Sequence, residues 1–570
     1  MDETSSVRRR LHSSEESATH TGCRDFISST NSIHPRHKPD DRNEGFTGIY
    51  GSLTPWKAGV IMKHRHGLGD WDWLDDWQRA NFGHVSLLLI VSALQLLIGP
   101  SRGGPAAIMV SYTLVGFTVY LVLSALGEVA AWMPDPSTVA DQAFRFCDPA
   151  LGFALGWIYW MKYAVITANQ LTAATLVISL WLDTQNVNPG VWITIFLVLI
   201  TAVNYTHHSL PSQIEFYISI IKLLVMSGLM ILSLVLVLGG GPNRHPTSFQ
   251  YRFRTGFSVQ TSDSVEVFFH TCGGLSSATF AYIGSERSNI LARSPNVPKA
   301  MNRAIKYTFY RILILHLVGI TLLGLILPYR TVGLFGFRIS TAKVAASPFV
   351  AALIVAGIGV LPHILNACIL VFILSIATYD LYLATRALSD LALRKRAPVI
   401  LARVNRNDVP VYALAVSAMI ASWAYVNVTK DSSIVFAYLV DLVTMLGLLT
   451  WVSILITHIC FVRARRAQGI PDSALVFRAR FGLTGTWLAL SLCVLISLTM
   501  IFNSLPIHDH KIRFDITKFV ASYAGIPIYI TLYLGHRIIL KSKHIDPRDA
   551  DFWSDKRVAT PPGIELQPMS

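Results

Sequence analysis

The sequence predicts an all-α polytopic membrane protein with twelve transmembrane helices. Of its 570 residues, 52% are hydrophobic and only 14% are charged, whereas soluble proteins carry about 25% charged residues. The mean hydropathy is +0.46. The decisive observation is the repetition of long apolar runs, each of which can cross a bilayer core of about 30 Å.

The apolar runs divide the chain into three parts. Residues 1–84 are rich in Ser, His and charged residues, which predicts a mostly disordered tail. Residues 85–540 carry the spans, and residues 541–570 form a second tail. Within 347–384 the run exceeds a simple crossing, so we expect its end to project from the membrane. The predicted spans are 85–100, 105–131, 150–182, 190–207, 214–239, 264–284, 306–328, 347–384, 410–428, 433–462, 484–504 and 516–539.

The surplus of positive charge predicts an orientation. The net charge of +14 lies largely in short loops between spans, so it does not indicate a nucleic-acid partner. Lys and Arg gather in the loops after spans six, eight and ten, for example Arg293, Arg396 and Arg466. Because cytoplasmic loops carry such an excess, and because an even number of spans puts both tails on one side, both tails are predicted to be cytoplasmic.

No pattern for catalysis, a metal or a cofactor is found. The six cysteines are scattered, without the spacing of a disulfide framework or a zinc site. A nucleophile elbow and a phosphate-binding glycine loop are also absent from the sequence. The sequence therefore predicts neither an enzyme nor a bound cofactor. The lipid bilayer is a predicted partner of the protein.

The sixth span carries residues that suit a local break. The stretch His270–Lys299 starts apolar, contains Gly273, Gly274 and Gly284, and ends polar and basic. A helix in lipid satisfies all its backbone groups internally, and in many transporters an interruption near the midplane forms the substrate site. The alternative is an unbroken helix whose small residues allow close packing.

Several motifs resemble one family in order and spacing. They are GGPAAIMVSY (103–112), GEVAAWMP (127–134), DPALGFALGWIYWMKYAVITANQLTAA (148–174), IEFYISIIKLL (214–224), FAYIGSE (280–286), VPKAMNRAI (297–305), SPFVAALIVAGIGVLPHILNACIL (347–370), DLYLATRALSDLALRKRAP (380–398) and VRARRAQGIP (462–471). Over about residues 79–545 the chain resembles the fungal amino acid permeases, the yeast amino acid transporter family of the amino acid–polyamine–organocation superfamily.

This resemblance implies a fold and a function. The fold would have two inverted five-helix repeats plus two extra helices, with helices one and six broken in the middle. The activity would be secondary active transport, a proton symport that imports amino acids by alternating access. Its partners would be the amino acid, protons, and trafficking or ubiquitination machinery at the tails. The location would be the plasma membrane, with an internal membrane as the alternative.

The resemblance also implies a substrate site at the sixth-helix break, where backbone carbonyls would face the substrate ammonium. Tyr282 or Phe280 would act as a gate over the substrate. Gln170 of span three and Ser92 of span one would complete the binding site. The residues that would line the break are Ala278, Phe280, Ala281, Tyr282, Ile283 and Gly284.

The first span departs from the family pattern. The permeases carry a glycine-rich run there, whose N–H groups bind the substrate carboxylate, whereas residues 90–95 read IVSALQ. Branched and long side chains hinder the close backbone approach that glycine permits. Three explanations stay open: an altered site, a non-transporting receptor-like relative that senses amino acids, or an inactive product of an error in the predicted coding sequence.

Two ionisable residues are predicted to couple transport to protons. Lys222 lies inside span five, either snorkelling to the surface or replacing a sodium ion and exchanging a proton. Glu286 follows the predicted break as a gate partner or a cap. Gln170 stands where many of these permeases have a glutamate, and it cannot titrate. Glu128, at the end of span two, is expected to pair with a loop arginine.

Overall fold

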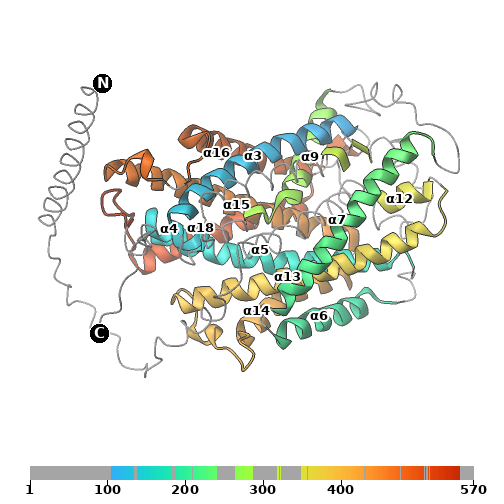
Figure 1. Cartoon of the computed structure of the whole chain (residues 1–570), viewed down its shortest axis with the longest axis horizontal. Coiled ribbons are helices and arrows are strands. Elements are labelled where there is room, and N and C mark those ends of the chain that lie inside the picture. Colours follow the sequence, from blue (N-terminus) through green and yellow to red (C-terminus); the bar gives the residue numbers. More distant parts are fainter. Residues whose placement is uncertain are drawn as a thin grey trace, which may run out of the picture. The chain divides into compact units, whose positions relative to one another are not determined.

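Helices form nearly all the regular structure in the part of the chain that the computed structural model describes (Figure 1). The predicted tail 1–84 and the first predicted span 85–100 lie outside that part, as does most of span seven. The described residues are 104–133, 138–181, 187–207, 209–240, 264–286, 317–319, 321–322, 348–355, 357–428, 432–475, 477–505, 507–508, 511–512 and 514–552.

The long helices follow the predicted apolar runs closely. In chain order they are α3 (Gly104–Trp132), α4 (Val139–Phe146), α5 (Pro149–Ile178), α6 (Pro189–Thr206), α7 (Leu210–Val237), α9 (Ser264–Tyr282), α12 (Pro348–Val355), α13 (Leu361–Leu393), α14 (Val411–Ala421), α15 (Ser432–Ala467), α16 (Gly482–Thr499), α17 (Ile516–Tyr523) and α18 (Gly525–Ile539).

Short elements join these helices. The expectation of an all-α fold is supported, and β1 and β2 add only a two-residue antiparallel ladder with Ile507 opposite Ile512. The short elements are the 3₁₀ helices η5 (Val399–Ala402), η6 (Ser422–Val428), η7 (Asp472–Ala474) and η8 (Met500–Ser504), and the strands β1 (Ile507–His508) and β2 (Lys511–Ile512).

Seven helical segments among the described residues are long and apolar enough to cross a membrane. This finding agrees with a multi-pass membrane protein, while the count of twelve and the two inverted repeats stay predictions. The seven are Ala107–Trp132, Pro189–Thr206, Leu210–Val237, Leu361–Leu393, Val411–Val428, Ser432–Ala467 and Gly482–Ser504.

The run 347–384 is not one continuous helix, as the predicted span suggested, while the projection of its end from the membrane stays a prediction. It divides into α12 and α13, and Gly357 between them has a φ of +78°. That conformation is accessible to glycine and strained for other residues. Pro362 then occupies the first turn of α13, where a missing N–H costs nothing. The prediction missed this turn because hydropathy does not report backbone conformation.

Helix α5 is the central element of the described bundle. It contacts α4, α13, α14, α15 and α18, and it lies in the middle of the view (Figure 1). Although it is buried along most of its length, it includes the polar residues Lys162, Asn169 and Gln170, all of which are buried. Polar and ionisable side chains inside a membrane bundle face its interior. Helix α5 therefore carries chemistry as well as packing.

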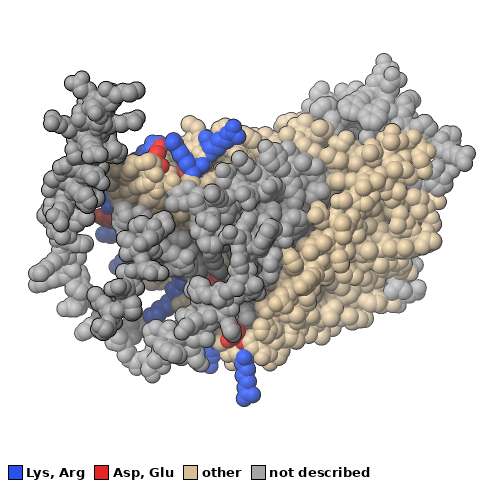
Figure 2. Space-filling view, viewed as in Figure 1, with Lys and Arg blue, Asp and Glu red and all other residues tan. Residues whose placement is uncertain are grey.

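Helix α7 is polar on its inner face and apolar on its outer face. The buried positions include Glu215, Ser219 and Lys222, which recur every three or four residues and so share one stripe. Leu224 and Ile231, on the other side, are 67% and 65% exposed. Figure 2 shows a broad outer surface without charged residues, with the visible charges gathered at one end. An apolar exterior around a polar interior is the arrangement that a lipid environment favours.

The carboxy-terminal residues pack against the helix bundle. The Phe552 side chain is buried against Trp132, Phe146 and Phe461. The Arg145 guanidinium lies 2.8 Å from the Asp551 carboxylate. The predicted second tail is thus fixed to α3, α4 and α15 as far as Phe552.

Candidate functional site

Helix α9 ends in a turn at the predicted break. The helix stops at Tyr282, the N–H of Ile283 donates to the carbonyl of Phe280 at 3.2 Å, and Gly284 has a φ of +90°. We call residues 283–286 the α9 turn. The chain beyond Glu286 lies outside the described residues, so a resumed sixth helix stays a prediction. Five of the predicted lining residues have fully buried side chains: Ala278, Phe280, Ala281, Tyr282 and Ile283.

A buried ion pair holds the α9 turn to α5. The Lys162 ammonium donates to Glu286 Oε1, and both side chains are completely buried. Glu286 Oε2 accepts from the N–H of Gly284 at 3.0 Å and from the indole N–H of Trp451, in α15, at 3.2 Å. Glu286 therefore caps the turn through Gly284 and also pairs with a cation. Sequence reasoning named Glu286 but missed Lys162 and Trp451.

The Lys162 ammonium has aromatic as well as acidic neighbours. It lies 4.4 Å from the ring centroid of Tyr159 and 4.5 Å from that of Tyr163. Cations are attracted to the negative faces of aromatic rings, most strongly where water is excluded. The rings therefore help to compensate the charge of Lys162, but its one acidic partner among the described residues is Glu286.

Tyr282 points from α9 toward α3. Its hydroxyl donates to the carbonyl of Tyr112 at 3.0 Å, and the two rings lie 6.0 Å apart. A Cβ on Gly116 would come within 2.9 Å of the Tyr282 hydroxyl oxygen. The position of Tyr282, the predicted gate, thus depends on the lack of a side chain at Gly116 in α3.

Replacing Gly116 with alanine is expected to destabilise the protein by about 1–3 kcal/mol, because the added methyl overpacks the Tyr282 site. The loss should shrink when Tyr282 is also changed to phenylalanine, which lacks the nearest atom. Thermal unfolding of the purified variants measures both effects. Gly228→Ala is the matched control, because a Cβ there meets nothing within 4 Å. An equal loss in the Tyr282→Phe background would contradict the assignment.

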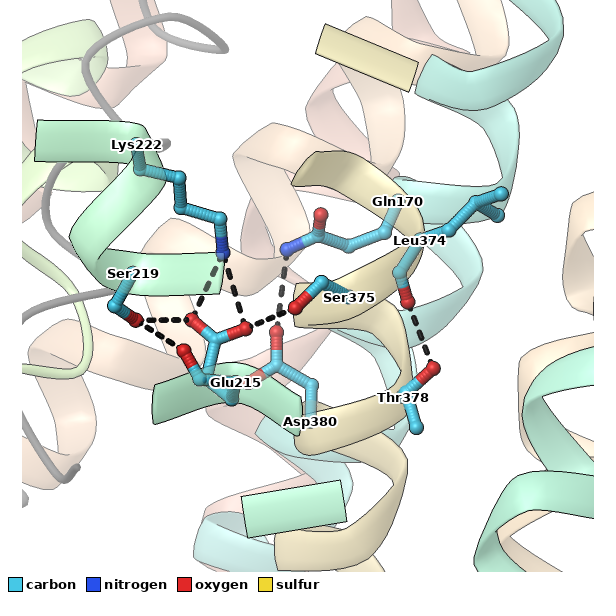
Figure 3. A network of polar contacts seen from close by, with 8 residues as sticks. All are labelled: Gln170, Glu215, Ser219, Lys222, Leu374, Ser375, Thr378 and Asp380. Carbon is cyan, nitrogen blue, oxygen red and sulfur yellow. Dashed lines mark hydrogen bonds and ion pairs between the residues drawn. The ribbon is translucent and has the colours of Figure 1, made fainter. Parts of the chain in front are cut away.

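A second buried ion pair occupies the inner face of α7 (Figure 3). The Lys222 ammonium lies 2.9 Å from Glu215 Oε1 and 3.0 Å from Oε2, and both side chains are 1% exposed. Ser219 and Ser375 also donate to this carboxylate. Lys222 therefore does not snorkel to the surface, which corrects that alternative. Glu215 was missed, although its spacing of seven residues, two helical turns, puts it on the same face as Lys222.

Gln170 lies with this second group and not with the α9 turn. Its side-chain N–H donates to Asp380 Oδ2, in α13, at 3.2 Å (Figure 3). Its Oε1 is buried and has no hydrogen-bond partner among the described residues. Gln170 follows Lys162 by about two helical turns, or roughly 12 Å along α5. The predicted substrate-binding residues thus lie in two separate groups. One group is at the α9 turn, near Lys162, and the other contains Gln170, beside the Lys222–Glu215 pair. Ser92 and the other residues of the first span lie outside the described residues.

Two further buried carboxylates hold helices together. The expected pairing of Glu128 with a loop arginine is not found among the described residues; its Oε2 lies 3.5 Å from His458 Nε2 and accepts from the N–H of Ala479 at 2.8 Å. Asp441, in α15, accepts from Ser276 of α9, from Asn503 and from Ser522. The sequence did not reveal these partners, because they come from segments that are distant along the chain.

Comparison with known proteins gives a consistent result. The family model of amino acid permeases matches residues 85–546. The dicarboxylic amino acid permease of Saccharomyces cerevisiae is 39% identical over 487 residues, which cover 83% of this chain and 79% of the relative. An uncharacterized amino-acid permease of Schizosaccharomyces pombe is 33% identical over 480 residues, covering 82% and 90% of the two chains.

The proline-specific permease of Saccharomyces cerevisiae is 32% identical over 480 residues, which cover 80% of this chain and 75% of the relative. These relatives are named as transporters and not as enzymes, and they do not favour the receptor-like alternative. The matched region contains every helix that contributes to the two buried ion pairs. This chain therefore belongs to the amino acid permease family, whose members transport amino acids across membranes.

Proposed function

We propose that the protein imports dicarboxylic amino acids together with protons, by alternating access, across the plasma membrane. The observation that carries the proposal is the fully buried pair of Lys162 and Glu286 at the α9 turn. It combines a cation suited to an anionic substrate with a carboxylate suited to a proton. Both tails would be cytoplasmic and open to trafficking or ubiquitination machinery.

Two observations support the substrate class: the sequence identity to the named relatives, and the charges of the buried residues in span three. Identity to the dicarboxylic amino acid permease is 39%, against 32% to the proline-specific and 30% to the lysine-specific permease. By the family resemblance, Gln170 replaces a glutamate, which removes one negative charge from span three. A second carboxylate on the substrate needs a cation in a site of low dielectric. Lys162 is our candidate for that cation.

The same pair provides a reason for coupling to protons. While Glu286 is ionised, it neutralises Lys162, and an anionic substrate would be repelled. When Glu286 takes up a proton, Lys162 becomes an uncompensated buried charge, which is unfavourable unless another anion pairs with it. The substrate carboxylate would be that anion. Proton and substrate then favour each other's binding by the same free energy, as linkage requires.

The α-amino and α-carboxyl groups of the substrate would bind where the family resemblance puts them. The carbonyls of the α9 turn and of Ala278, Phe280 and Ala281 would face the ammonium, because half-helix C-termini suit cations. Ser92 of the first helix would lie near the α-carboxylate. By the family resemblance Gln170 would also bind the substrate, through the Oε1 that has no partner among the described residues, although it lies with the Lys222–Glu215 pair and not at the α9 turn. Lys222 would exchange a proton as the site opens and closes.

Uptake by yeast cells that lack their own permeases tests the proposal. Cells that express this chain should accumulate labelled glutamate and aspartate, faster at low external pH and not after a protonophore. Unlabelled proline and lysine should compete poorly. A preference for neutral or basic amino acids would refute the substrate class and leave transport standing. Binding without accumulation would refute transport itself and favour the receptor-like alternative.

A further inference from the structure

Two cysteines that are far apart in the sequence meet in the fold. The Sγ atoms of Cys147 and Cys460 lie 2.9 Å apart, although 313 residues separate the two positions. Cys147 directly follows α4 as its C-cap residue and is 4% exposed. Cys460 is half-buried in α15. Both sulfurs are free thiols in this structure.

The neighbourhood of this thiol pair is well ordered by polar contacts. The N–H of Ile545 donates to the carbonyl of Cys147 at 3.1 Å. The next residue, Asp148, caps α5, and its carboxylate also accepts from Tyr533 at 3.1 Å and from Arg537 at 3.3 Å. The α4–α5 corner is therefore held in place on several sides. A bond between the thiols would need only a small approach of the sulfurs.

A covalent bond at this position would join the two helices that hold Glu286. Cys147 lies two residues before the start of α5, which carries Lys162, and Cys460 is in α15, which carries Trp451. Lys162 and Trp451 bind the two different oxygens of Glu286. The bond would thus fix the relative position of α5 and α15. Any transport step that moves these helices apart would be blocked.

We propose that Cys147 and Cys460 form a redox-sensitive pair, which a hydroperoxide oxidises to an intramolecular disulfide that arrests transport. When hydrogen peroxide is the oxidant, the more exposed Cys460 thiolate attacks one peroxide oxygen and the O–O bond breaks. The products of this step are a sulfenic acid on Cys460 and one water. The Cys147 thiol then attacks that sulfur, the S–O bond breaks, and the second water leaves. Two thiols lose two electrons, which reduce one peroxide, and a cellular dithiol reverses the reaction.

This chemistry fits a pair of thiols in an otherwise reducing compartment. Disulfides inside cells are uncommon, and those that form are usually transient and sensing. A reactive thiol beside a buried resolving thiol is the usual arrangement of such sensors. The arrest of transport, unlike formation of the bond, rests on the proposed function.

Hydrogen peroxide treatment of the full chain tests the bond directly. The protein is treated, denatured, alkylated and digested, and the peptides are identified by mass spectrometry. We expect a peptide that links Cys147 to Cys460, loss of two alkylated cysteines, and recovery of both after dithiothreitol. Cys147→Ser and Cys460→Ser should each abolish the linked peptide. Cys368→Ser is the matched control, because Cys368 is half-buried in α13, and it should leave the linked peptide intact.

Uptake measured on the same samples tests the consequence. Peroxide should remove most of the uptake of the unmodified protein and of Cys368→Ser, and dithiothreitol should restore it. Cys147→Ser should keep its uptake after peroxide. Oxidation of Cys460 to a sulfinic acid without the linked peptide would overturn the proposal, as would a linked protein that transports at the normal rate. A protein that forms the bond but transports nothing in either state would refute the proposed function and leave the redox-sensitive pair standing.

Discussion

Replacing Glu286 with glutamine is expected to abolish proton-driven accumulation of acidic amino acids. Glutamine has the shape of a protonated glutamate and keeps an acceptor for the N–H groups of Gly284 and Trp451. It cannot ionise, so it holds the site permanently in the state that favours an anion beside Lys162. Binding of labelled glutamate to the purified protein should therefore persist and lose its dependence on pH.

The same substitution should reveal the energetic cost of an unpaired Lys162. Removing one partner of a buried ion pair typically costs about 3–5 kcal/mol, because the other charge stays buried without compensation. Glu286→Gln and Lys162→Met should each lower thermal stability in the absence of substrate. The double variant should recover most of that loss, since replacing a whole buried pair is often neutral. Glutamate should stabilise Glu286→Gln but not the double variant.

Glu128→Gln is the matched control for these effects. Glu128 is also a buried carboxylate, but it contacts His458 and the N–H of Ala479, away from Lys162. Its substitution should leave the pH dependence of binding unchanged. If Glu286→Gln binds glutamate with the same pH dependence as the unmodified protein, Glu286 is not the coupling group. If Glu286→Gln and Lys162→Met lose no stability, then Lys162 and Glu286 do not neutralise each other's buried charge, contrary to what the geometry indicates.

The positions of several long helices among the described residues could be predicted from hydropathy alone. The predicted spans 190–207 and 214–239 became α6 and α7 with ends shifted by only a few residues. Burial in lipid requires a continuous apolar run, and such runs are visible without any knowledge of the fold. Turns within a run are not visible in this way. The division between α12 and α13 depends on the backbone conformation of Gly357, which hydropathy does not measure.

The candidate site was harder to predict because its partners are distant in the sequence. Lys162 and Glu286 are 124 residues apart, and no periodic pattern connects them. A lysine in the middle of a predicted span was nevertheless a signal, because an ionisable residue inside a membrane is a functional candidate by default. Glu215 was accessible to sequence reasoning, since helical spacing places it two turns from Lys222. The thiol pair carried no such signal, because Cys147 and Cys460 are 313 residues apart in the sequence.

Replacing Lys222 with arginine is expected to stop accumulation while leaving substrate binding intact. The guanidinium can pair with both oxygens of Glu215, as the lysine does at 2.9 and 3.0 Å. It also stays protonated throughout the physiological range, unlike a buried lysine. If Lys222 must release a proton in each transport cycle, arginine preserves the ion pair and removes that step. Glutamate binding should keep its pH dependence, because Glu286 is unchanged. Lys543→Arg, at an exposed position, is the control for the exchange of residue type.

A second variant distinguishes a loss of proton exchange from a steric effect of the larger arginine side chain near Phe372. Lys222 lies 6.0 Å from the Phe372 ring centroid, so the larger guanidinium can disturb the packing there. Glu215→Gln combined with Lys222→Met removes both charges at once and should fold, because neither charge is left unpaired. We expect this double variant to bind glutamate and fail to accumulate it. A purely structural ion pair makes the opposite prediction, since its neutral replacement would support accumulation. Accumulation by either variant would therefore remove Lys222 from the transport cycle and leave proton coupling to Glu286.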